Sequence, residues 1–173
     1  MEIRRAGKEE FEAVRAFYYA VIDAMQTAPY RPGWQRDIYP EPEFLRASVE
    51  RGELFLGEEG GETVAAMVLN HDCNEGYAKV AWPTKAAPGE VLLIHALCVY
   101  APCAGRGLAK ELVRYAIDEA RRLGMKAMRL DVLKGNVPAE RLYPACGFRY
   151  VDTVVMFYED TGWTDYEMYE LAL

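Results

Sequence analysis

The sequence predicts an α/β fold (an α+β mixed sheet) in which a mixed β-sheet carries helices on both faces. Of its 173 residues, 51% are hydrophobic, which is enough to fill one core, so we expect a single domain over residues 1–173. Apolar residues at helical spacing alternate with short apolar runs. Between residues 91 and 133, strand, helix and strand follow one another, an order typical of a parallel strand pair.

Two helices are expected first. Residues 8–26 place apolar side chains at three- and four-residue steps, and residues 41–51 do so over a shorter span. The segment 27–40 between them is rich in proline and aromatic residues, so we expect it to be irregular.

A β-hairpin is expected next, because the period of the apolar residues changes to that of strands. Residues 54–56 and 63–69 form its strands, and the turn lies at residues 58–61. Residues 77–82 are expected to form an edge segment of the sheet.

The second half of the chain alternates strands and helices. Its expected elements are a buried strand at 91–99, a helix from Leu108, a strand at 127–133, a short helix near 138–145 that Gly147 ends, and strands at 148–158 and 165–173.

The charge balance bears on the partners. The chain has 20 basic and 27 acidic residues and a net charge of −7, so we do not expect it to bind nucleic acid. No apolar run approaches the ~18 residues of a membrane span, and the first residues do not resemble a signal peptide, so we expect a cytoplasmic protein that does not enter membranes. The four cysteines and two histidines show no zinc spacing, so no metal site is expected.

A turn of small residues joins the strand at 91–99 to the following helix. Gly105 and Gly107 let a ligand approach the backbone, and the free N–H groups of the first helical turn favour an anion. The turn lacks the third glycine and downstream acidic residue of a dinucleotide fingerprint, and Gly107 is not followed by the Lys-Ser/Thr of a Walker loop. An anion held mainly by backbone amides remains.

A second motif follows at Asn136-x-x-Ala139-x-x-Leu142-Tyr143-x-x-x-Gly147-Phe148. With the glycine turn, at this separation, it resembles the GNAT superfamily of acetyl-coenzyme A-dependent N-acetyltransferases. The resemblance covers roughly residues 90–150 by motif. It implies a mostly antiparallel sheet with one splayed parallel strand pair, acetyl-CoA (coenzyme A) as the cofactor, and an amine as the acceptor.

The resemblance also implies the cofactor-binding residues. Ala104 stands where the family places a basic or amide side chain, and Arg106 beside it supplies a positive charge. Asn136 matches an asparagine that contacts the cofactor, although the same residue also suits the N-cap of the next helix. The expected contacts are Leu97, Cys98 and Val99 on the strand, Ala104, Gly105, Arg106, Gly107, Leu108 and Ala109 at the turn, and Asn136 and Tyr143 beyond it.

Two side chains are expected to carry the chemistry. Tyr143 matches a tyrosine that lies beside the cofactor sulfur, and a phenol of pKa about 10 can protonate the leaving thiolate. His95 interrupts an apolar strand near the position of a family base, and with a pKa of about 6.5 it can accept a proton from the amine. The alternatives are an aromatic that only packs, for Tyr143, and a buried, hydrogen-bonded histidine, for His95.

The acceptor side is expected to be aromatic. Tyr18, Trp34, Tyr39 and Tyr158 lie in elements that line the acceptor in this fold, and with acidic neighbours they suit a cationic or aromatic amine. A homodimer is expected through late strands or the first helices, with Trp163 or Tyr166 at the contact.

Three functions are compatible with these motifs. The first is an N-acetyltransferase that acts on a small molecule, an amino acid derivative or a peptide or protein amine by direct attack in a ternary complex. The second is a non-catalytic domain that binds or senses acyl-CoA, and the third is a nucleotide enzyme. The pair His95 and Tyr143 favours the first.

Overall fold

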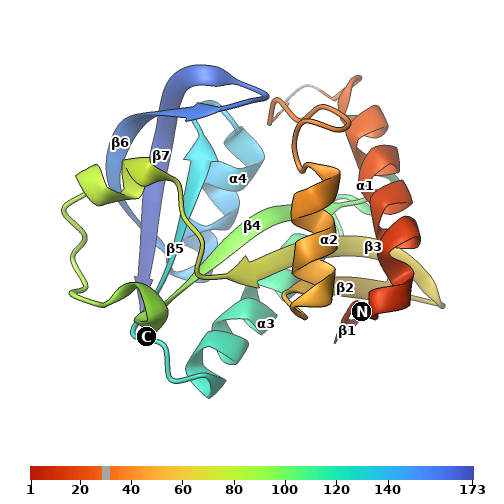
Figure 1. Cartoon of the computed structure of the whole chain (residues 1–173), viewed down its shortest axis with the longest axis horizontal. Helices are drawn as coiled ribbons and strands as arrows, with labels where there is room; N and C mark the ends of the chain where they lie inside the picture. The colour runs from red at the N-terminus through yellow and green to blue at the C-terminus, as the bar shows by residue number, and fades with distance from the viewer. Residues whose placement is uncertain (29–31) are drawn as a thin grey trace.

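The computed structural model describes residues 1–28 and 32–173 and contains a seven-stranded sheet in the order β1-β2-β3-β4-β5-β7-β6 (Figure 1). The elements are β1 (Glu2–Arg5), α1 (Phe11–Met25), α2 (Pro42–Glu50), β2 (Leu54–Glu59), β3 (Glu62–Asn70), β4 (Val91–Val99), α3 (Leu108–Arg122), β5 (Ala127–Leu133), α4 (Val137–Leu142), β6 (Arg149–Tyr158) and β7 (Gly162–Ala172). Residues 29–31 of the loop that was expected to be irregular lie outside the described part.

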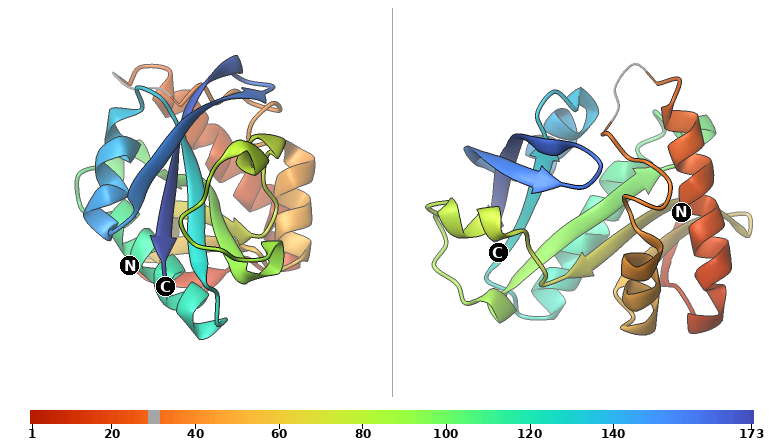
Figure 2. Two further views of the ribbon diagram at one scale, coloured as in Figure 1. Left: turned by 90° about the vertical axis from the view of Figure 1, so that its left-hand side faces the viewer. Right: turned by 45° about the horizontal axis from the view of Figure 1, so that its top comes forward.

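Helices cover both faces of the sheet, as expected. The left view of Figure 2 shows α3 and α4 on one side and α2 with the segment 71–90 on the other. The apolar faces of α1 and α2 pack on β2 to β4 around Tyr18 and Leu45, whereas α3 packs on the opposite face around Leu112 and Met128. Within the described residues no helix is long and apolar enough to cross a membrane.

The sheet is mostly antiparallel and contains one parallel pair, β4 with β5. Their ladder consists of Val91↔Ala127, Leu92↔Met128 and Leu93↔Arg129, and it goes no further. Beyond these pairs the two strands separate toward their C-terminal ends (Figure 1). The splayed pair is therefore confirmed, and the second half of β4 has no strand on that side.

A β-bulge bends β4 where the strands separate. Cys98 pairs with Ala66 but His95 pairs with Val68, so β4 carries one extra residue between them. Ala96 has a φ of 48°, in the left-handed region that residues with a Cβ rarely adopt. The buried Tyr18 hydroxyl donates to the Ala96 carbonyl at 2.9 Å and so supports this conformation.

Two elements differ from the expectation. The N-terminal strand β1 was not expected, because four residues of mixed polarity show no strand period; its Arg4 bonds Glu10 and Glu58 at 2.7 Å and 2.6 Å. The segment 77–82 is not a sheet edge. It overlaps a 3-10 helix at Glu75–Lys79, which buries Tyr77 against the sheet.

The exposure of two residues on β7 limits which of them a second copy of the chain could contact. Trp163 is 65% exposed, whereas Tyr166 is 6% exposed and belongs to the core. Of the two residues expected at a homodimer contact, only Trp163 is accessible. The homodimer itself stays a prediction.

Candidate active site

The glycine turn before α3 forms an open cradle of backbone amides. Gly105 and Gly107 have φ values of 78° and 86°, and a Cβ built on either would meet no atom within 4 Å. The first helical bond runs from the Glu111 N–H to the Gly107 carbonyl at 3.1 Å. Among the described residues no acceptor takes up the N–H groups of residues 105–110. Such a cluster of free donors at a helix N-terminus fits a diphosphate.

Side chains add little positive charge to this cradle. Ala104 offers only a methyl group, and Arg106 is paired with Glu59 of β2 at 2.9 Å. The Glu59 carboxylate raises the pKa of Arg106 and offsets its charge. The backbone donors therefore carry most of the attraction for an anion.

Leu97 and Val99 face the gap between β4 and β5, and Cys98 does not. The Tyr100 N–H donates to the Val64 carbonyl at 2.8 Å, and antiparallel partners alternate, so Cys98 shares its backbone bonds with Ala66. The N–H and C=O of Val99 then point toward the gap. The Cys98 side chain is 3% exposed on the α1 and α2 face, so its expected contact with the cofactor is corrected.

Asn136 occupies the N-cap position of α4 but makes no capping bond with its side chain. Glu140 reaches back instead, and its Oε1 accepts from the Gly135 N–H at 2.6 Å. The Asn136 side chain thus remains available, and it lines a cavity. Of the two roles expected for Asn136, the structure favours the ligand contact.

A cavity of about 120 Å³ passes between the separated strands. His95 of β4 lines this cavity. The lining also includes Leu97, Asn136, Ala139 and Tyr143 on the α4 side and Trp34, Tyr39, Asp131, Tyr158, Asp160 and Tyr166 on the opposite side. The cavity therefore connects the expected donor position with the expected acceptor position.

Tyr143 presents a free hydroxyl to this cavity. Its ring packs against Phe148 and Tyr169 at centroid distances of 5.7 Å and 6.5 Å, and the residue is 7% exposed. The hydroxyl makes no hydrogen bond to a described residue, and burial raises its pKa above the usual 10. Burial therefore keeps the phenol protonated, and its O–H is free to donate a hydrogen bond to a ligand.

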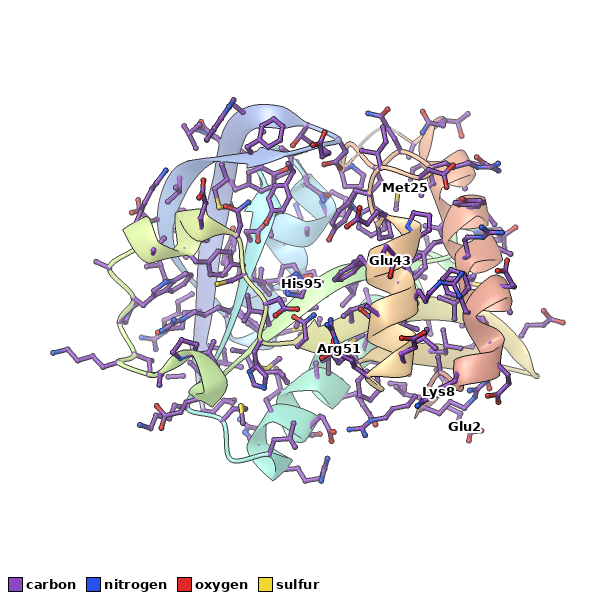
Figure 3. All side chains as sticks on the ribbon, viewed as in Figure 1. Glu2, Lys8, Met25, Glu43, Arg51 and His95 are labelled. Atoms are coloured by element: carbon purple, nitrogen blue, oxygen red, sulfur yellow. The ribbon has the colours of Figure 1, made fainter. Side chains whose placement is uncertain are left out.

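His95 differs from the titrating base that the sequence suggests. Figure 3 places it near the centre of the molecule, and its ring lies 6.2 Å from that of Phe44 on α2. Burial is the main cause that lowers its pKa to about 4, while the backbone and charge of Asp72 oppose this shift. Its Nε2 atom is buried without a partner among the described residues. His95 is therefore neutral at pH 7, and the expected pKa of about 6.5 is corrected.

Asp131 on β5 is a site residue that the sequence analysis missed. Its Oδ2 accepts from the hydroxyls of Tyr77 at 2.8 Å and Tyr158 at 3.1 Å. Burial raises its pKa above the usual value, and the two tyrosine bonds partly offset this effect. The signal in the sequence was a carboxylate in the strand 127–133, whose other residues except Arg129 are apolar.

The segment 71–90 brings Tyr77 to this carboxylate. Trp82 donates from Nε1 to the Tyr77 carbonyl at 2.9 Å, and Arg129 lies over the Trp82 ring at 4.3 Å. Arg129 and Glu170 form a buried ion pair at 2.9 Å, and both bond the backbone of Thr84. These contacts hold the segment against β5 through Arg129 and against β7 through Glu170.

Three of the four aromatic residues expected at the acceptor side line the cavity. These are Trp34, Tyr39 and Tyr158, and Tyr166 joins them from β7. Tyr18 is fully buried and lies behind the bulge, so its expected contact with the acceptor is corrected to a supporting role. The described residues contain no group of three or more His, Cys, Asp and Glu that could hold a metal ion.

Comparison with known proteins agrees with this geometry. Residues 19–148 match the model of the acetyltransferase (GNAT) family. No curated protein sequence matches the chain significantly.

Three solved structures illustrate the likeness of fold. A GNAT-family acetyltransferase from Streptococcus agalactiae has a TM-score of 0.81 at 18% identity, with 99% of this chain and 95% of that chain covered. The ribosomal-protein-alanine N-acetyltransferase of Brucella melitensis has a TM-score of 0.73 at 18% identity, with both chains fully covered. YncA of Salmonella typhimurium, a candidate acetyltransferase solved with acetyl-CoA, has a TM-score of 0.72 at 21% identity over 100% and 94% of the two chains.

The matched segment contains the glycine turn, the separated strands and α4, which build the cradle and the donor half of the cavity. Because the family model matches well over half of its length, this chain belongs to the acetyltransferase (GNAT) family.

Proposed function

We propose that the protein transfers an acetyl group from acetyl-CoA to a primary amine by direct attack within a ternary complex. The observation that carries this proposal is the cavity through the split sheet. It joins the unpartnered Tyr143 hydroxyl on one side to the half-buried Asp131 carboxylate on the other. A domain that only binds acyl-CoA would not need a cavity that continues past the donor to acidic side chains.

The chain holds the donor with backbone groups and one amide side chain. The N–H groups of residues 105–110 bind the diphosphate, Asn136 contacts the arm of the donor, and Leu97 and Val99 line the gap that the arm occupies. Acetyl-CoA supplies an activated thioester there. Val99 presents its backbone N–H to the gap, where it can stabilise the negative charge that develops on the carbonyl oxygen.

Proton transfer involves two groups. Tyr143 donates a proton to the departing sulfur, so the thiol leaves in its neutral form. For the proton that the amine loses, the sequence suggests His95 and the structure adds Asp131. A neutral imidazole of pKa about 4 is a weak acceptor, whereas the Asp131 carboxylate has a raised pKa and attracts the cation before the reaction. We propose that Asp131 takes one proton from the bound ammonium before the attack. The second proton, which the nitrogen loses after the attack, replaces the one that Tyr143 gives to the thiolate.

Release of free thiol from acetyl-CoA across a panel of amines tests the proposal. We expect Tyr143→Phe and Asp131→Asn to lower kcat by about 10²- to 10⁴-fold, since each removes a proton-transfer group. His95→Ala should change kcat by less than about threefold. Asp165→Asn is a matched control, because Asp165 is paired at the surface with Lys134 at 3.2 Å.

The contrary outcomes are distinct. Tight binding of coenzyme A with no thiol release for any amine would support the non-catalytic acyl-CoA domain instead. A loss of activity in His95→Ala, with Asp131→Asn unaffected, would return the role of base to His95.

A further inference from the structure

We infer that the acceptor is a primary amine with no carboxylate on the carbon that bears the nitrogen. The inference rests on the proposed function and concerns the acceptor half of the same cavity. It excludes free α-amino acids and retains simple amines and amines whose neighbouring acid is masked.

The acceptor half has continuous aromatic walls. The rings of Trp34 and Tyr39 lie 5.5 Å apart, those of Tyr39 and Tyr158 lie 6.3 Å apart, and those of Tyr158 and Tyr166 lie 4.9 Å apart. They come from the loop after α1, from β6 and from β7. Such rings attract a cation through their faces and also pack against an apolar body.

The charged groups of this half are acidic. Asp131 and Asp160 line it, so an entering ammonium meets two carboxyl groups, and burial raises the pKa of both. No lysine or arginine belongs to the described lining, and His95 is neutral. Among the residues that the structure describes, two cations nearby in the chain are engaged elsewhere, since Arg36 pairs with Asp23 and Lys134 pairs with Asp165.

An α-carboxylate would therefore find no lysine or arginine among the described lining residues. It would follow the nitrogen into the space beside Asp131 and lose its water against aromatic rings, and the like charges would repel one another. An amide at the same position has the same size but no charge. Charge, and not volume, is what the site discriminates.

Matched ligands separate charge from size. The probes are phenethylamine, phenylalanine and phenylalaninamide, with isobutylamine, valine and valinamide as an aliphatic set. Binding of each to the protein saturated with coenzyme A is measured by calorimetry. We expect the amine and the amide of each set to bind at least tenfold more tightly than the amino acid.

Substitutions in the turn between β6 and β7 then test which residue causes the preference for ligands without the carboxylate. Asp160→Arg should shrink the preference at least tenfold by giving the carboxylate a partner, and Asp160→Asn should shrink it to a smaller extent. The control is Glu159→Arg, which changes the net charge equally at an exposed neighbour outside the cavity lining. The control should leave the preference unchanged.

Several results would overturn the inference. These are equal or tighter binding of the amino acids, binding of none of the six probes, and the same response in Asp160→Arg and Glu159→Arg. The proposed function fails differently. If the amines bind with the expected preference but no amine releases thiol, the selectivity stands and the transferase activity does not.

Discussion

Tyr18 shows how a residue outside the reaction shapes the site. It is fully buried on α1, and its hydroxyl holds the Ala96 carbonyl at the bulge of β4. The bulge turns β4 away from β5 and so opens the space for the donor. A side chain expected to contact the acceptor therefore acts through the backbone.

Tyr18→Phe should lower the free energy of unfolding by about 1–3 kcal/mol, because a buried carbonyl loses its partner. The KM for acetyl-CoA should rise as well, since the bulge loosens. Urea unfolding and steady-state kinetics measure the two effects. Tyr19→Phe is the control, because Tyr19 is only half-buried and bonds Asp37 at the surface. Equal effects of the two changes would remove the special role of Tyr18.

Glu59→Gln should tighten coenzyme A binding by up to about fivefold at low salt. Arg106 would lose the carboxylate that offsets its charge and would then face the diphosphate. The pair is exposed, so added salt should erase the gain. Calorimetric titration at two salt concentrations measures this, with Glu62→Gln on the same hairpin as control. A loss of affinity would mean that Glu59 orients Arg106 productively.

Single residues were the hardest to assign from the sequence. The motif predicts that Tyr143 lies beside the cofactor sulfur, and the structure places it in the lining of the cavity. Its part in the reaction stays a prediction. Asp131 was missed because its place depends on hydroxyls from two distant segments, at Tyr77 and Tyr158. The pKa of His95 depends on tertiary burial, which the composition of its strand does not specify.

The segment 71–90 is the element that adapts this fold to its site. It connects two neighbouring strands, β3 and β4, yet it folds over β5 and β7 and delivers Tyr77 to Asp131. Its fixation through Arg129 and Glu170 is what makes the Tyr77 hydroxyl a reliable donor.

Tyr77→Phe should move the acidic limb of the pH profile of kcat/KM to higher pH. The Tyr77 bond lowers the pKa of Asp131 against the effect of burial, so its loss raises that pKa and more base is protonated at a given acidic pH. Thiol release measured between pH 5 and 9 shows the shift. Tyr150→Phe, at an exposed tyrosine of β6, should not move the limb. An unshifted limb in Tyr77→Phe would contradict the role of Asp131 as the base.

Most elements were predictable because their apolar periods are long and regular. The helix from Leu108 and the strand 91–99 are examples, and both start where expected. β1 and the 3-10 helix at Glu75–Lys79 were not predictable, because each is too short to show a period and depends on contacts made elsewhere. The splay of β4 and β5 followed from the family resemblance and not from periodicity.

At the scale of the whole molecule, donor binding and stability are linked. A ligand that binds only the folded state at 100 times its Kd adds about 2.7 kcal/mol to the free energy of unfolding. For a chain of this size this corresponds to a rise in Tm of roughly 5–10 °C. Thermal denaturation with and without coenzyme A measures the rise.

Gly107→Ala should abolish this rise, because the new Cβ strains a φ of 86° and fills the cradle. Gly124→Ala is the matched control at the other end of α3, with a φ of 71° and equally open space. Both variants should lose about 1–2 kcal/mol without ligand, and only Gly124→Ala should recover stability with it. Full recovery by Gly107→Ala would place the diphosphate elsewhere.

Because β4 and β5 pair over only a short stretch, the sheet consists of two parts that are joined at the N-terminal ends of these strands. Only the pairs from Val91↔Ala127 to Leu93↔Arg129 join the two parts, and Tyr143 and Asp131 lie on opposite sides of the opening. One more residue pair between β4 and β5 would strengthen the sheet and close the cavity between the strands. The sequence must therefore specify that the backbones of β4 and β5 stop pairing after Leu93 and Arg129.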